Sequence, residues 1–493
     1  MSSTEKHTTE NDFSIARKKQ KTIDEQNTPE TSSDSVFSDL EEYETNTNPS
    51  TAHINYDLYL ETINRKVLDF TYPKICSVSL KTTSIYSCLT CSKYFQGRST
   101  ATPAYRHSID LGHHVFANLT NLKFYILPEN YEVKGAKALE SLNDIKKQIS
   151  PSYNDKQIVK LNQPDNFGID LNGDSYVPGF VGLTNMNGQL DYANVLVLAL
   201  SHVSNIRDFF LTWGRTMGNC DDGDEIIYDR SEFDLCDLFG LTVRKLWFDH
   251  LFKKHLSTSE LMHLIEIKSN GKFGNSGEAH NAIAGSSNSV GKTGHKSVKD
   301  FFVWLVNNLN AELKNSGLKS TILTKNIQGK LENENDKTKK TIKFWYLTIQ
   351  LPSQSLFKDS QKPVVEQFEL NNLLKKLPFR IVKTPKVLIL HIDRDTTKQE
   401  IIGINHLNEN VVRFDPDCMH FSGKKYRLIT NIIIVAASEM NSDGLEQLKI
   451  RYKVQLLDKT NLHWYEIDDL KVEKIQKEFL EFNLTSLQFW ETL

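Results

Sequence analysis

Two cysteines and two histidines have the spacing of metal ligands. Cys88 and Cys91 form a CxxC pair, fifteen residues separate Cys91 from His107, and five separate His107 from His113. Zinc takes four nitrogen or sulfur ligands at the corners of a tetrahedron, and a CxxC turn presents two thiolates to one ion. The sequence therefore predicts a Zn²⁺ site formed by Cys88, Cys91, His107 and His113.

Two nearby residues leave alternatives open for this ligand set. His114 adjoins His113, and Cys76 lies upstream as either a replacement ligand or a buried structural thiol. Gly112 eases the turn before His113, because glycine tolerates backbone angles that other residues avoid. We therefore favour His113 as the fourth ligand.

A DNA-reading C2H2 finger is the obvious alternative for these four residues. Such a finger has about twelve residues between cysteine and histidine, including a short basic recognition helix. Here the gap is longer and contains Tyr94, Phe95, Gly97 and Pro103, which are poor material for that helix. With strand-like runs at 115–117 and 122–127, we predict a compact zinc-stapled α/β module over residues 53–150 instead.

The loop at residues 182–194 is the second region whose residues could do chemistry. It contains Gly182 and Gly188 and runs into an almost wholly apolar stretch that predicts a buried helix. Free N–H groups and the helix dipole stabilise an anion at such an N-terminus, so a nucleophile is expected there. The position holds Asp191. We expect this loop to lie at the surface.

Length and composition limit the classes of protein to consider. The 493 residues suffice for two or three domains, and a net charge of −3 gives no global field suited to nucleic acid or an anionic membrane. No apolar run reaches membrane-spanning length, and the N-terminus is polar rather than a signal peptide. The six cysteines include the CxxC pair, which favours a reducing compartment over a disulfide scaffold.

Amino-acid composition and sequence pattern divide the chain into four segments. Residues 1–52 carry five Lys/Arg against eleven Asp/Glu and few large apolar residues, which predicts a disordered acidic tail. A basic cluster at 17–21 inside it could be read by a nuclear import receptor. Residues 151–175 read as a mostly irregular linker. Residues 176–493 form the second folded unit, with a flexible insertion at 269–295.

This second unit has a helical half followed by a β half, so we predict an α+β domain. The helical segments are expected at 192–202, 205–211, 235–264 and 299–313. From residue 321 onward β-branched and aromatic residues predict antiparallel strands, interrupted by one helix near 370–377. The strands are expected at 321–324, 341–351, 387–392, 410–414, 426–438 and 450–457.

The first unit resembles the UBP-type zinc finger of ubiquitin-specific proteases. The resemblance rests on the Cys88–Arg98 segment, the His107–His113 pair and the Asn121–Tyr131 segment. Many such fingers hold a ubiquitin C-terminal tail with an aromatic slot and an arginine. Here Lys93 stands where the arginine is expected, and no tryptophan precedes the CxxC. We therefore expect a structural or docking role rather than ubiquitin binding.

The second unit resembles a ubiquitin-specific protease domain, with its papain-like cysteine peptidase fold. The resemblance rests on segments 182–185, 328–331, 385–390, 426–428 and 464–469. Such enzymes use a thiolate, a histidine base and an Asp or Asn that orients the imidazole. The resemblance places Asp191 at the cysteine position and Arg451 at the histidine position, and leaves Asp468 as the third member. It implies a pseudo-deubiquitinase.

Three segments indicate a particular branch of the ubiquitin-specific protease family. They are the loop at 182–194, Asn64–Phe70 and Tyr176–Leu183. These segments resemble the spliceosomal family of snRNP assembly-defective proteins. The resemblance implies a nuclear pre-mRNA splicing factor that acts with the U4/U6.U5 tri-snRNP and other spliceosomal proteins as a docking scaffold, with at most indirect RNA contact.

Two other functions compete with this one. The first is a deubiquitinase that uses Cys220, Cys236 or Cys418, with His202 or His463 as the nearest alternative bases in sequence. The second is a ubiquitin reader without catalysis.

Overall fold

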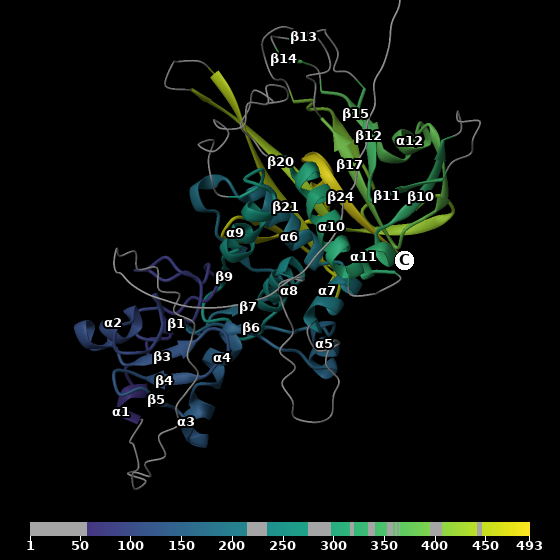
Figure 1. Ribbon diagram of the computed structural model, residues 1–493. Coiled ribbons are helices and arrows are strands. Elements are labelled where there is room, and N and C mark those ends of the chain that lie inside the picture. Colours follow the sequence, from purple (N-terminus) through teal and green to yellow (C-terminus); the bar gives the residue numbers. More distant parts are fainter. Residues whose placement is uncertain are drawn as a thin grey trace, which may run out of the picture. The chain divides into compact units, whose positions relative to one another are not determined.

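The computed structural model describes most of the chain beyond residue 56 (Figure 1). The disordered tail predicted for residues 1–52, its basic cluster and Cys220 lie outside the described residues. No helix in the described part is both long and apolar enough to cross a membrane. The described ranges are 57–213, 234–274, 297–315, 320–333, 341–352, 358–359, 362–363, 365–394, 407–440 and 446–493.

The first unit contains an antiparallel five-stranded sheet in the order β2-β1-β3-β4-β5. Its strands are short and mostly buried, and β3 and β4 confirm the runs predicted at 115–117 and 122–127. The elements are α1 (Asp57–Leu60), β1 (Ile85–Cys88), β2 (Tyr94–Gln96), α2 (Pro103–Leu111), β3 (Val115–Asn118), β4 (Phe124–Ile126), β5 (Tyr131–Glu132), α3 (Ala136–Ser141) and α4 (Asn143–Ile149).

The last part of the gap before His107 belongs to helix α2, which the sequence analysis did not predict. It begins at Pro103, and proline is favourable at a first helical position because no N–H is needed there. Gly112 ends it in the left-handed conformation, with φ of 64°. The helix thus carries His107, and Gly112 reverses the chain so that His113 returns toward it.

The segment predicted as a mostly irregular linker is largely structured. Helix α5 (Asp155–Leu161) begins with a capping box between Asn154 and Gln157, and β6 (Gly168–Ile169) pairs with β7 (Ser175–Tyr176). Tyr153 and Leu161 belong to the core of the second unit. The prediction for 151–175 missed these contacts because apolar anchors are sparse in this polar sequence.

The helical half surrounds α6, whose residues from Asp191 to Ser201 are all buried. The predicted stretch 235–264 is two helices, separated where β9 pairs in parallel with β8. These elements are β8 (Gly182–Leu183), η1 (Met186–Gly188), α6 (Asp191–Ser201), α7 (Ser204–Leu211), α8 (Asp234–Leu246), β9 (His255–Leu256), α9 (Ser259–Lys268), α10 (Val298–Asn315) and α11 (Ile322–Asn326).

Two predictions in this half are wrong. The strand expected at 321–324 is the start of α11, because the Thr321 side chain accepts the Thr324 N–H and caps a helix. The insertion predicted to be flexible from 269 is packed at its start. Phe273 is buried and lies with its ring 5.1 Å from that of Phe301. Residues 275–295 lie outside the described part of the chain.

The β half is dominated by an eight-stranded sheet in the order β12-β17-β24-β20-β21-β22-β23, with β19 paired to β20 (Figure 1). The sheet is antiparallel except at the β12–β17 edge, which is parallel, so the prediction of an antiparallel half is wrong there. Its strands are β12 (Leu347–Gln350), β17 (Val387–Asp393), β19 (Met419–Phe421), β20 (Lys424–Met440), β21 (Glu446–Asp458), β22 (His463–Asp468), β23 (Lys471–Ile475) and β24 (Leu484–Thr492).

Smaller elements flank this sheet. They include a three-stranded sheet in the order β11-β10-β16 and the parallel pair β15–β18. The remaining elements are β10 (Gly329–Asn333), β11 (Thr341–Phe344), β13 (Lys358–Asp359), β14 (Lys362–Pro363), β15 (Gln367–Glu369), α12 (Leu370–Lys375), β16 (Phe379–Lys383), β18 (Val411–Arg413) and η3 (Lys477–Phe482). Helices α6 and α10 pack on each other, and α6 packs on β21, which fixes the N-terminus of α6 beside that strand.

Residues 55–493 cluster as one compact unit, and buried polar contacts join the finger to the helical half. Lys245, which is buried, donates from Nζ to the Phe70 carbonyl oxygen at 2.5 Å. Burial lowers the pKa of Lys245 to about 8. The Lys74–Glu260 ion pair lies at the same junction, with 3.3 Å between Nζ and Oε1.

Candidate functional site

The four predicted zinc ligands come together in the finger. Cys88 ends β1, Cys91 lies in the following turn, His107 lies on α2, and His113 follows its C-cap. Their ligand atoms all lie within 4.8 Å of one another. Cys88 Sγ is 3.6 Å from His113 Nδ1, Cys91 Sγ is 3.4 Å from His107 Nε2, and the two imidazole nitrogens are 3.1 Å apart.

These separations fit a tetrahedral zinc site. Bonds of about 2.3 Å to sulfur and about 2.0–2.1 Å to nitrogen place such ligand atoms about 3.5 Å apart. The hydrogen bond between the two thiols lowers the pKa of Cys91 and raises that of Cys88. Phe95 stacks on His107 with 4.1 Å between ring centroids and holds that imidazole in place.

The two alternative ligands lie outside this group. His114 donates from Nδ1 to the Leu127 carbonyl oxygen at 2.8 Å. Cys76 Sγ accepts the backbone N–H groups of Ser79 at 3.3 Å and Gln96 at 3.2 Å. The structure thus gathers the set that we favoured, with His113 rather than His114.

The second predicted site begins at Asp191, the first residue of α6. Its side chain is buried, and its Oδ2 accepts the backbone N–H of Tyr452 on β21 at 2.8 Å. Burial raises the pKa of Asp191, whereas the Tyr452 N–H and the Arg451 charge oppose that shift. The carboxylate therefore joins the N-terminus of α6 to β21, where the helix dipole favours negative charge.

Arg451 and Asp468 contact each other directly. Arg451 Nη2 lies 2.6 Å from Asp468 Oδ1 and 3.3 Å from Asp469 Oδ2. The other Asp468 oxygen lies 3.2 Å from Lys453 Nζ. The sequence analysis assigned no role to Asp469 or Lys453, although Asp469 lies in the segment 464–469 that resembles the protease family.

The space around Asp191 is filled. The Leu183 N–H donates to the Asp469 carbonyl oxygen at 2.9 Å, and a Cβ added to Gly182 would lie 2.7 Å from Leu470 Cα. The cavity beside Asp191 measures about 10 Å³, which is room for about one water molecule at most. The expectation of a surface loop is thus wrong at Gly182, Leu183, Asp191 and Asn194, all of which are buried.

The other histidines and thiols lie in settings unlike a catalytic one. His202 is buried, and burial lowers its pKa to about 3. His463 is exposed on β22. Burial raises the pKa of the Cys236 thiol. The half-buried Cys418 makes only a local contact with His420, with 3.9 Å from Sγ to Nδ1.

Comparison with known families agrees with both units. The family described as "Zn-finger in ubiquitin-hydrolases and other protein" matches residues 76–138. The family described as "Ubiquitin carboxyl-terminal hydrolase" matches residues 181–489. The chain belongs to the ubiquitin carboxyl-terminal hydrolase family. The finger match and the Cys/His group together confirm zinc as the cofactor.

Similar proteins place the chain in the splicing-related branch of this family. It is 30% identical to "Pre-mRNA-splicing factor SAD1" of Saccharomyces cerevisiae, over 88% of this chain and 93% of that one. It is 29% identical to "Probable mRNA-splicing protein ubp10" of Schizosaccharomyces pombe, over 98% of this chain and 96% of that one. These matches confirm the predicted branch.

The fold agrees with a solved structure in the same branch. The crystal structure of an essential yeast splicing factor matches with a TM-score of 0.71 and 30% identity, over 88% of this chain and 100% of that one. The predicted order of a zinc finger followed by a peptidase-like α+β domain is therefore confirmed.

Proposed function

We propose that this protein is a non-catalytic pre-mRNA splicing factor of the nucleus. It supports assembly or stability of the U4/U6.U5 tri-snRNP as a protein-docking scaffold, with other spliceosomal proteins as its partners. The names of its relatives support the splicing role, and the family resemblance supports the tri-snRNP. The observation that carries the non-catalytic role is the bond from Tyr452 N–H to Asp191, which occupies the nucleophile position with a structural group.

The chemistry of the three triad positions explains why catalysis is not expected. Asp191 would have to form a mixed anhydride, which lies uphill from the isopeptide. Arg451 cannot act as a base, because a guanidinium keeps its proton in proteins. Asp468 has no imidazole to orient and instead binds two cationic side chains. With nucleophile and base both replaced, only weak residual stabilisation of an oxyanion would remain.

We further propose that Cys88, Cys91, His107 and His113 hold the zinc ion of the finger. Four protein ligands make a closed site, which is typical of structural rather than catalytic zinc. When bound, the ion supplies a cross-link between distant chain segments. The residues themselves tie the end of β1 to α2 and to the chain after Gly112.

Splicing in depleted cells tests the proposed function. We expect unspliced pre-mRNA to accumulate, and the tagged full-length protein to co-purify with tri-snRNP proteins. The Asp191→Asn variant should rescue splicing, because its amide oxygen can still accept the Tyr452 N–H. Failure to recover tri-snRNP proteins would contradict the scaffold role. Saturable binding of ubiquitin to the full-length chain would instead favour the alternative of a non-catalytic ubiquitin-binding protein.

A further inference from the structure

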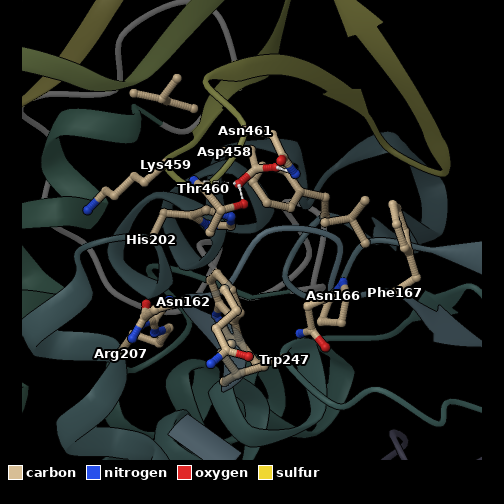
Figure 2. Close-up of a pocket in the computed structure, with 16 residues that line it drawn as sticks. Asn162, Asn166, Phe167, His202, Arg207, Trp247, Asp458, Lys459, Thr460 and Asn461 are labelled. Carbon is tan, nitrogen blue, oxygen red and sulfur yellow. Dashed lines mark hydrogen bonds between the residues drawn. The ribbon is translucent and has the colours of Figure 1, made fainter. Parts of the chain in front are cut away.

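A second cavity lies beside His202, the C-cap of α6, and so at the opposite end of that helix from Asp191. Figure 2 shows the residues that line it. Its volume is about 50 Å³, enough for several water molecules or the end of a side chain. It is bounded by the turn after α5, by the α6–α7 junction, by Trp247 and by the β21–β22 turn at 458–461. None of the residues with a role in the zinc site or the degenerate triad lines it.

The two cations that line this cavity already have partners. Arg207 lies 4.5 Å over the Trp247 ring and donates to Asn162 Oδ1 at 2.7 Å and Asp208 Oδ1 at 2.8 Å. Lys459 donates to Ser204 Oγ at 2.7 Å and to a carboxylate oxygen of Glu491 at 2.5 Å. An anionic ligand would therefore have to displace existing acceptors from both.

Two acceptor atoms in the cavity wall have no partner. His202 donates from Nδ1 to the Leu198 carbonyl oxygen at 2.8 Å, which leaves a lone pair on Nε2. The residue is 96% buried, and burial lowers its pKa to about 3, so the ring is neutral. Its Nε2 and the Asn166 Oδ1 are both buried without a hydrogen bond. Buried groups of this kind normally accept a hydrogen bond from protein, from ordered water or from a bound ligand.

The third acceptor is the carboxylate of Asp458, which is buried at the β21–β22 turn. Its Oδ1 accepts the Thr460 N–H and hydroxyl at 2.9 and 2.6 Å, and its Oδ2 accepts from Asn461 Nδ2 at 3.1 Å. Among the described residues, none of the ion pairs involves Asp458. The Asp458 carboxylate is therefore held by hydrogen bonds rather than by a direct ion pair.

The mouth of the cavity has the character of a protein-binding surface. Phe167, one of the lining residues, is 53% exposed. Exposed apolar side chains around a buried polar pocket are typical of sites where a partner inserts one anchoring side chain.

We propose that this cavity receives an arginine side chain from a protein partner. A guanidinium carries only donors, is planar and remains charged, so it complements His202, Asn166 and Asp458 together. A phosphate or carboxylate group would have no donor to offer these three acceptors and would have to draw Arg207 and Lys459 away from their present partners. The Phe180 ring, also part of the wall, offers an apolar surface to the flat face of the guanidinium.

A titration with a small probe tests this proposal. N-acetyl-arginine methylamide would be added to the full-length protein with ¹⁵N-labelled histidine, and the His202 Nε2 resonance would be followed. We expect a saturable shift toward the hydrogen-bonded position. The neutral citrulline analogue should bind about tenfold more weakly or less, because the charge-assisted bonds are lost. Equal binding of both probes, or a response only to inorganic phosphate, would overturn the proposal.

Two charge variants sharpen the test. Asp458→Asn should weaken arginine binding about tenfold, whereas Asn166→Asp should strengthen it several-fold by adding a second carboxylate. Asp417→Asn is the matched control, because Asp417 is exposed and pairs with Lys477 away from the cavity. Weaker binding by Asn166→Asp would contradict the proposal even if Asp458→Asn failed to fold. Since no probe involves the spliceosome, failure here would leave the proposed function standing.

Discussion

The zinc site and the proposed triad positions Asp191, Arg451 and Asp468 both bring together polar residues from distant segments, but the contacts of those residues differ. In the finger, two thiols and two imidazoles converge on one point with the spacing of a tetrahedron. In the triad region, the groups bond one another or the backbone, as Arg451 does with Asp468 and Asp191 with Tyr452. The Cys and His side chains are arranged to share one ligand, whereas Asp191, Arg451 and Asp468 form cross-links within the protein.

The largest expected effect is loss of zinc from the finger. Changing Cys91→Ser should abolish stoichiometric zinc and unfold this unit, because structural zinc contributes on the order of 10 kcal/mol in zinc-finger peptides. Zinc content and thermal unfolding of the full-length protein would measure this. Cys418→Ser, which alters a half-buried cysteine outside the group, is the control and should retain zinc. Full zinc content in Cys91→Ser would show that the ligand set is wrong.

Variants of Asp191 test whether this residue is a structural cross-link between α6 and β21. Asp191→Ala should lower the free energy of unfolding by about 1–3 kcal/mol, because the Tyr452 N–H is left buried without an acceptor. Asp191→Asn keeps an acceptor for the Tyr452 N–H, so its free energy of unfolding should fall much less. Chemical denaturation measures the free energy of unfolding of both variants. If the alanine variant is as stable as the wild type, Asp191 is not a structural cross-link.

Arg451 should matter less than Asp191, since its side chain is 42% exposed. Arg451→Ala is expected to cost at most about 1 kcal/mol, because partly exposed ion pairs are weak and Lys453 still binds Asp468. Lys471→Ala, which removes a more exposed pair, should have almost no effect. If Arg451→Ala lowers the free energy of unfolding by several kcal/mol, the Arg451–Asp468 pair stabilises the fold more than a surface ion pair can.

The smallest effect concerns pH. Burial raises the pKa of Asp191, so ionisation disfavours the folded state. The stability of the wild type relative to Asp191→Asn should therefore fall as pH rises above about 3.9, the ordinary carboxyl value, and level off above the raised pKa. Paired denaturation curves from pH 4 to 7 would show it. A rise in this relative stability from pH 4 to 7 would mean that hydrogen bonds to Asp191 lower its pKa more than burial raises it.

Sequence and structure agreed where local spacing carried the information. The spacing of the CxxC pair and the two histidines predicted the Cys/His group that the structure brings together. The roles that the family resemblance gives to Asp191, Arg451 and Asp468 remain predictions. The bond from Tyr452 to Asp191 could not be predicted, because it depends on how β21 lies against α6 across 261 positions of the chain. Likewise, Thr321 reads as a strand residue by its β-branching, yet its side chain caps a helix.

The most direct test of the central claim is a covalent trap. The full-length, zinc-loaded wild type would be incubated with ubiquitin bearing a thiol-reactive C-terminal electrophile, and the products examined by intact mass spectrometry and peptide mapping. The account predicts no ubiquitin adduct and no hydrolysis of a fluorogenic ubiquitin ester. A stoichiometric adduct on any cysteine, with ester turnover lost when that cysteine is changed, would contradict it.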